Sequence, residues 1–193
     1  MRPMIRLAAL ALLLATTPTA TARDNALLYE RSDEHPYGRP NPAAPKEISQ
    51  FAFMIGRNDC TESRRTPGGD EWVDGKRTWD AWYTLDGYAI MDSGRSGAST
   101  NGNLRVYDAN KGQWFVTFFS MPGYSSGIWS GGATETGIEL NQPQKAPGTD
   151  LDGFSRLTFS NISDEGFDWL GEWVSADGNI RFPFWRISCK RSG

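Results

Sequence analysis

The residue types most often used in catalysis and metal binding are scarce in this chain. One histidine, His35, and two cysteines, Cys60 and Cys189, occur among the 193 residues. A Ser-His-Asp triad needs a histidine beside its nucleophile, and His35 lies in a proline-rich stretch. These counts exclude a histidine-rich metal site and a cysteine-rich zinc site. We therefore expect no metal and no cofactor.

Carboxylates are the remaining candidates for acid–base chemistry. Four of them lie in stretches with the residue pattern of strands: Asp80, Asp92, Asp168 and Glu172. Because successive strand residues point to opposite faces, Asp168 and Glu172 share one face, which we expect to point outward. A carboxylate that instead points inward beside Arg105 or Arg186 would form a pair with perturbed pKa values, able to transfer protons. No catalytic residue can be named from this pattern.

Aromatic residues make up 12% of the chain, and 8 residues are tryptophan. They share strand faces, as Trp79 does with Tyr83 and Trp169 with Trp173. Such faces fill the core of a barrel, or they line a cavity for one flat or apolar ligand that a few polar groups orient. A row of exposed tryptophans would instead suit a carbohydrate. The candidate ligand-binding residues are Trp79, Tyr83, Arg105, Tyr107, Phe115, Thr117, Phe119, Trp129, Trp169 and Trp173.

The elements that must position these residues are short strands. Apolar residues at Ile48, Phe51, Ala52 and Ile55 predict a short helix over 47–55. After it, alternating patterns separated by turn residues predict about ten strands. The expected strands are 57–65, 77–85, 88–95, 103–108, 114–121, 127–133, 136–141, 154–160, 167–174 and 180–189.

Consecutive hairpins favour a barrel over a sandwich, because closure removes exposed strand edges. The predicted fold is therefore all-β: an antiparallel up-and-down barrel with a short N-terminal helix. In the last strand, Phe182 and Phe184 share a face with Arg186, whereas Trp185 shares one with Cys189. A bulge would change which of them points inward, so the inward face of this strand stays open.

The first 22 residues have the pattern of a secretory signal peptide. Arg2 and Arg6 precede an apolar run over 7–15, and Ala20-Thr21-Ala22 is a small-x-small cleavage site. The run is too short for a membrane span. Residues 23–46 read as a flexible or extended proline-rich arm, and residues 47–193 as the barrel domain. We expect a periplasmic or secreted protein with no membrane span.

Export changes how the two cysteines are interpreted. In an oxidising compartment, Cys60 and Cys189 are expected to form a disulfide. The alternative, a catalytic cysteine, would need a base beside it. The formal net charge is −3, so the basic surface of a nucleic-acid-binding protein is missing.

Three short segments carry a resemblance to known proteins. They are Phe51-Ala52-Phe53-Met54-Ile55-Gly56, Leu85-Asp86-Gly87 and Gly171-Glu172-Trp173. Over roughly 47–190 the chain resembles calycin, or lipocalin-like, barrels and an uncharacterised exported bacterial family with such a domain. The resemblance implies a helical turn leading into a first strand. Asn58 stands where lipocalins carry a tryptophan in the first strand. The Cys60–Cys189 bridge would join this first strand to the last one.

The function expected from these features is the binding of a small, largely apolar ligand inside the barrel. A second hypothesis is a periplasmic enzyme of the same fold that uses inward carboxylates and arginines. A third is a structural or interaction protein with a filled barrel. An empty, dry, aromatic cavity favours the first hypothesis. An inward carboxylate with a raised pKa beside a polar pocket favours the second, and a packed barrel with an exposed aromatic patch favours the third.

Overall fold

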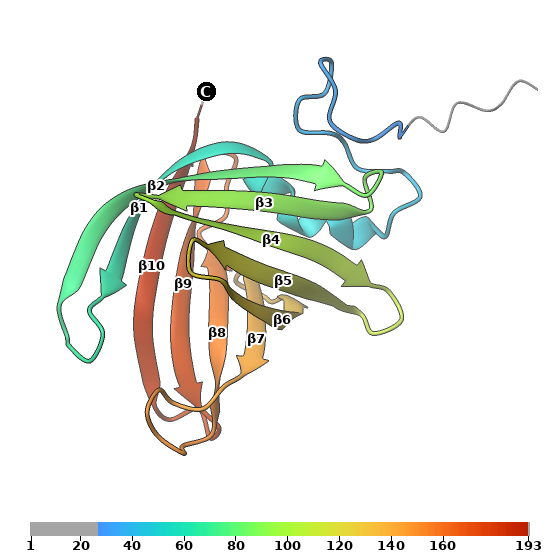
Figure 1. The fold of residues 1–193 in the computed structure, drawn as a ribbon. Helices are drawn as coiled ribbons and strands as arrows, with labels where there is room; N and C mark the ends of the chain where they lie inside the picture. The colour runs from blue at the N-terminus through green and yellow to red at the C-terminus, as the bar shows by residue number, and fades with distance from the viewer. Residues whose placement is uncertain (1–26, 193) are drawn as a thin grey trace, which may run out of the picture.

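The computed structural model of the protein describes residues 27–192. Ten antiparallel strands close into one barrel, as the sequence predicts. Each strand pairs with the next along the chain, and β1 pairs with β10 to complete the ring (Figure 1). The strands are β1 (Gly56–Arg65), β2 (Trp72–Thr84), β3 (Ala89–Ser96), β4 (Ser99–Asp108), β5 (Gln113–Met121), β6 (Ser125–Ala133), β7 (Ile138–Pro143), β8 (Gly153–Ser160), β9 (Gly166–Ser175) and β10 (Arg181–Arg191). This architecture is compatible with a lipocalin-like fold.

Tight turns set the register of the strands. The predicted Asp86-Gly87 turn joins β2 to β3, and Leu85, Asp86 and Gly87 all have positive φ angles of 51°, 52° and 79°. Positive φ at consecutive turn positions matches the twist of the flanking strands. A side chain at Gly87 would lie 2.5 Å from the backbone nitrogen of Asn41 and 2.6 Å from the carbonyl oxygen of Arg39. Glycine is therefore required where the arm passes the turn.

One end of the barrel is closed by a 3-10 helix, η1 (Lys46–Met54), which matches the predicted helix closely. Phe51 and Met54 are fully buried, and the Phe51 ring lies 4.8 Å from that of Trp114, edge to face. Asn58 connects this helix to the barrel: its Nδ2 donates to the carbonyl oxygens of Met54 (3.0 Å) and Trp79 (3.1 Å). The Asn58 side chain therefore links the helix to the barrel.

The described part of the predicted arm, residues 27–45, contacts the same end of the barrel (Figure 1). The backbone N–H of Tyr29 donates to Oδ1 of Asp86 (3.0 Å), and the N–H of Asp86 donates to Oε1 of Glu30 (2.7 Å). Asn41 Nδ2 donates to the carbonyl oxygen of Asp86 (3.1 Å). These bonds attach the arm to the β2–β3 turn. The predicted signal peptide, 1–22, lies outside the described residues.

The predicted disulfide is present. Cys60 on β1 and Cys189 on β10 lie directly opposite each other, with 4.1 Å between their Cα atoms, and are bonded. The bridge therefore joins the first strand to the last at the position where the barrel closes. A disulfide is compatible with an extracellular location, because oxidising compartments preserve such bonds.

Candidate functional site

A cavity of about 180 Å³ lies inside the barrel. Side chains from seven strands line it, and most of the lining surface is apolar. The lining residues are Arg77, Trp79, Asn101, Asn103, Arg105, Phe118, Trp129, Ser155, Leu157, Phe159, Trp169, Phe184, Trp185 and Ile187.

The cavity has two chemically different sides. One side, on β2 and β4, is the polar wall: Arg77, Trp79, Asn101, Asn103 and Arg105. Four residues on β6, β8 and β9 form the apolar wall: Trp129, Leu157, Phe159 and Trp169. Strands β3 and β8, at the centres of these two groups, are five places apart in the ring of ten strands. The two walls therefore come from different sides of the barrel, and they meet where the Trp79 ring lies 6.1 Å from that of Phe159 and 6.4 Å from that of Trp169.

Four of the predicted ligand-binding residues line this cavity: Trp79, Arg105, Trp129 and Trp169. Three more are placed elsewhere. Tyr83 and Tyr107 belong to the core around η1, where the Tyr107 ring lies 5.6 Å from that of Trp114. Trp173 is buried, and its indole N–H donates to the carbonyl oxygen of Gln144 (2.9 Å) in the β7–β8 loop.

The other three predicted residues, Phe115, Thr117 and Phe119, lie on the opposite face of β5 from the cavity. Trp114 and Val116 are buried in the interior, and Phe118 lines the cavity. Thr117 is exposed, and Phe119 packs over Gly102 with 39% of its surface exposed. The run Trp114–Met121 is apolar on both faces, so alternation of polar and apolar residues could not identify the inward one.

An inward carboxylate lies beside Arg105, the arrangement that the sequence left as an alternative. Arg105 Nη2 donates to Oδ2 of Asp92 (2.5 Å), and Asn103 Nδ2 donates to its Oδ1 (2.7 Å). The side chains of the ion pair are 2% and 1% exposed. The Arg105 guanidinium also lies 4.9 Å from the centre of the Phe51 ring. This buried ion pair therefore lies where the polar wall meets the helix η1.

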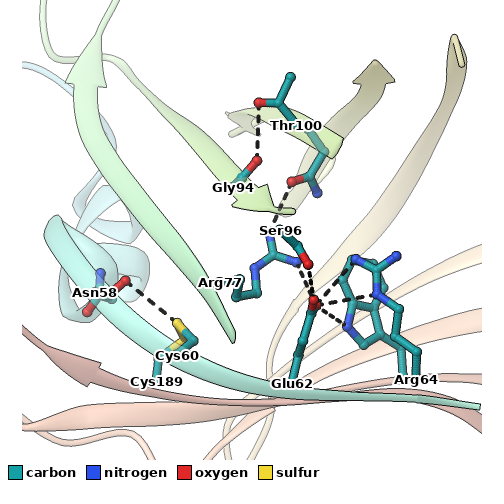
Figure 2. A network of polar contacts seen from close by, with 11 residues as sticks. Asn58, Cys60, Glu62, Arg64, Arg77, Gly94, Ser96, Thr100 and Cys189 are labelled. Atoms are coloured by element: carbon teal, nitrogen blue, oxygen red, sulfur yellow. Dashed lines mark hydrogen bonds and ion pairs between the residues drawn. A yellow bond between two sulfur atoms is a disulfide. The ribbon is translucent and has the colours of Figure 1, made fainter. Parts of the chain in front are cut away.

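A second inward network is centred on Glu62 of β1 (Figure 2). Its carboxylate accepts hydrogen bonds from the Trp185 indole N–H (2.9 Å) and the Ser96 hydroxyl. It pairs with Arg64 at 3.3 Å and with Arg77 at 3.6 Å. The network joins β1 to β2, β3 and β10 at the end of the cavity away from η1.

Gly94 on β3 makes room for the Arg77 side chain, which crosses this strand. Arg77 Nη2 donates to Oδ1 of Asn101 (3.0 Å) on β4. A Cβ atom at Gly94 would lie 1.8 Å from that Nη2 and 2.5 Å from the Asn101 oxygen. Any side chain at this position would therefore displace the guanidinium.

Burial and charge determine how these groups ionise. Burial alone raises the pKa of Glu62, but the hydrogen bond from Ser96 and the charges of Arg64 and Arg77 outweigh it, so the pKa lies below the ordinary 4.5. Burial lowers the pKa of Arg77 and of Arg105, and the neighbouring carboxylates Glu62 and Asp92 partly offset this. At neutral pH the site therefore contains ionised Glu62 paired with cationic guanidinium groups.

Sequence reasoning did not select Glu62 or Arg77, although strand alternation contained a signal for both. Glu62 is two residues from Cys60 and so shares its strand face, which the predicted disulfide made a candidate for the inside. Arg77 shares its face with Trp79, which was selected. We expected charged side chains to point outward, so Glu62 and Arg77 were not selected as candidates.

A bulge in β10 resolves the open question about its inward face. The register with β9 shifts between Pro183 and Trp185, so Phe184 and Trp185 both line the cavity. Adjacent residues of a regular strand could not do so, because they point to opposite faces.

The cavity adjoins a hollow of about 400 Å³ at the end of the barrel away from η1. The end of β3 contributes Ser96 to it, the start of β4 contributes Ser99, and the β5–β6 turn contributes Gly123. Four side chains line both spaces: Arg77, Asn101, Phe118 and Trp185. We call this hollow the mouth. These four side chains lie between the mouth and the cavity.

Glu172 belongs to a separate cluster, on the outer face of β9. Its carboxylate accepts hydrogen bonds from Arg156 (3.0 Å) and Arg181 (2.7 Å). These bonds and the charges of both arginines outweigh the effect of burial, so the pKa of Glu172 is lowered. Asp168, on the same face, accepts from Asn161 Nδ2 (2.7 Å). Neither carboxylate lines the cavity.

In residues 27–192, no group of three or more His, Cys, Asp or Glu side chains is placed to hold a metal ion. None of the helices in the described part of the chain has the length and hydropathy needed to cross a membrane. No protein-family model matches the chain, and no curated protein matches it significantly in sequence.

Proposed function

We propose that this protein binds a small, flat, largely apolar molecule inside the barrel. The observation that carries the proposal is the cavity of about 180 Å³ inside the barrel, one wall of which is largely aromatic. A dry apolar cavity of about 150 Å³ is large enough to bind benzene in another protein. The present cavity therefore has room for one substituted ring.

The arrangement of the walls favours ligand binding over the other two hypotheses, which are an enzyme and a structural or interaction protein with a filled barrel. Space inside the barrel distinguishes it from a barrel filled by its own side chains. Acid–base catalysis near neutral pH is favoured by a carboxyl group whose pKa is raised toward 7. The pKa of Glu62 is lowered instead, which supports a role in holding Arg77 rather than in transferring protons.

Titration with toluene tests the proposal. Toluene is one apolar ring with one methyl group, and we expect it to bind and to raise the melting temperature. At ten times Kd, the free energy of unfolding rises by about 1.4 kcal/mol, which corresponds to roughly 3–6 °C for a domain of this size. The measurements are calorimetric titration and thermal unfolding.

Two variants locate the binding. Leu157→Trp fills the cavity from the apolar wall, and we expect it to weaken toluene binding by at least tenfold. Thr117→Val, on the exposed face of β5, is the control and should bind as the wild type does. Circular dichroism checks that both variants fold. Absence of binding to the wild type, or equal binding to folded Leu157→Trp, would overturn the proposal.

A further inference from the structure

Largely apolar side chains cover the outside of the barrel across five neighbouring strands, β2 to β6 (Figure 1). One row of cross-strand partners runs over all five strands: Trp82, Met91, Leu104, Thr117 and Ile128. On each strand these residues alternate with the inward ones, so they share the outer surface. The row therefore forms one continuous band across this side of the barrel.

The rows on either side of this band extend it along the strands. Val106 pairs with Phe115 on one side, and Phe119 and Met121 follow Thr117 along β5 on the other. Val106, Phe119 and Met121 are 38%, 39% and 49% exposed. We call the band and these four flanking apolar residues the outer apolar face.

The outer apolar face has the composition of a covered surface. An antiparallel sheet commonly has one face against the core and a polar face in water. The outward positions of β1, β9 and β10 follow this rule, with charged residues such as Asp59, Asp168 and Arg186. Strand β5 is instead apolar on both faces over 115–121, which is typical of a strand that is covered on both. Yet Ile128, beside it on β6, is 56% exposed.

The size of the outer apolar face is that of the core of a protein–protein interface. From β2 to β6 and from Phe115 to Met121 it measures about 19 Å by 20 Å, or about 400 Å², at the usual strand spacing and rise per residue. A standard interface buries about 800 Å² of each partner, with an apolar core inside a polar rim. The outer apolar face is therefore large enough to supply that core.

We propose that two copies of this protein associate through the outer apolar face. A two-fold dimer buries the same face of both copies, and two apolar sheet faces pack about 10 Å apart. The outward positions over 100–106, 115–121 and 126–130 carry no charge, so the face meets its own copy without like-charge repulsion. Charges lie at the margin instead: Lys111 Nζ is 4.8 Å from the centre of the Phe115 ring.

Sedimentation equilibrium of the purified protein, with no ligand added, tests the dimer. We expect twice the mass of one chain at about 100 μM, because an apolar core of this size belongs to an interface near the lower end of the specific range. The dissociation constant should change less than about threefold when salt is raised, because salt screens charges and the contact is apolar.

Two substitutions place a carboxylate in the outer apolar face without removing a buried side chain. Thr117 is exposed at its centre, and we expect Thr117→Glu to weaken dimerisation about tenfold or more, since burying an unpaired charge is costly. The matched control is Thr61→Glu, at an exposed threonine on β1, four places from β5 in the ring. Ile128→Glu repeats the test, with Ile180→Glu in the β9–β10 turn as its control; these isoleucines are 56% and 54% exposed.

Circular dichroism checks that the variants fold. A wild type that stays monomeric at every concentration would overturn the proposal, and so would wild-type dimerisation of folded Thr117→Glu and Ile128→Glu. Equal weakening by Thr61→Glu would also overturn it. Co-flotation of a monomeric wild type, but not of Thr117→Glu, with phosphatidylcholine vesicles would assign the face to a lipid surface instead. Toluene titration tests the proposed ligand binding separately, so either proposal can fail alone.

Discussion

Glu62 connects four strands at the mouth of the barrel. It is 5% exposed, yet its carboxylate has partners on β2, β3 and β10 in addition to Arg64 on its own strand. A buried charge is tolerated when it is paired and hydrogen-bonded. The position of Arg77 in the polar wall therefore depends on Glu62 remaining ionised.

We expect Glu62→Gln to destabilise the protein in a pH-dependent way. The folded-state pKa of Glu62 lies below the ordinary 4.5. Its ionised form therefore stabilises the fold above pH 4.5, and this stabilisation is lost as the pH falls further, through the folded-state pKa. At pH 7 the variant should lose about 3 kcal/mol, because Arg77 loses its buried partner.

Urea unfolding at pH 7 and at pH 3 measures this difference between wild type and variant. The control is Glu135→Gln, at an exposed position between β6 and β7. The loss caused by Glu62→Gln should shrink at the lower pH, whereas the control should differ little from the wild type at both. A loss of the same size at both pH values would show that the charge of Glu62 does not stabilise the fold.

At the scale of elements, the sequence predicts the strands well and the inward faces only partly. Ten strands and the short helix are recognisable because turn residues such as Asp86-Gly87 separate alternating stretches. Alternation also places Trp79 and Trp169 inside. It fails on β5, where both faces are apolar. Alternation could not show which face of β10 points inward either, because the bulge before Trp185 interrupts the two-residue period of the strand.

The polar wall was harder to predict because it combines residues from separate strands. Arg77 reaches Asn101 across β3 only because position 94 is glycine. The Asp92–Arg105 pair depends on the register between β3 and β4. Alternation within one strand contains no information on either contact, so the sequence could offer an inward ion pair only as an alternative.

The disulfide between β1 and β10 should contribute strongly to stability. It joins residues separated by 129 positions. In the chain-entropy model, such a cross-link stabilises the fold by about 4–5 kcal/mol. We expect Cys60→Ser/Cys189→Ser to melt roughly 10 °C or more below the wild type. Toluene affinity should change little, because neither cysteine lines the cavity.

Scanning calorimetry of the double variant measures this effect. Wild-type protein treated with a reductant provides a comparison in which no residue is changed. If the variant and the oxidised wild type melted at the same temperature, pairing of β1 with β10 would hold the barrel closed without the bridge.

At the scale of the whole molecule, the two ends of the barrel differ. The helix η1 and the arm occupy one end (Figure 1), and the mouth lies at the other. Between them, the polar wall on β2 and β4 meets the apolar wall on β6, β8 and β9. A flat ligand in the cavity would therefore contact two walls of different chemistry.

The most direct test of this account is to locate a bound ring by NMR. In protein with ¹³C-labelled methyl groups, saturating toluene should give intermolecular nuclear Overhauser effects to the methyl groups of Leu157 and Ile187, which line the cavity. The methyl groups of Ile128, 56% exposed on β6, should give none. Effects confined to exposed methyl groups such as those of Ile128, or no effects at saturation, would contradict a ligand site inside the barrel.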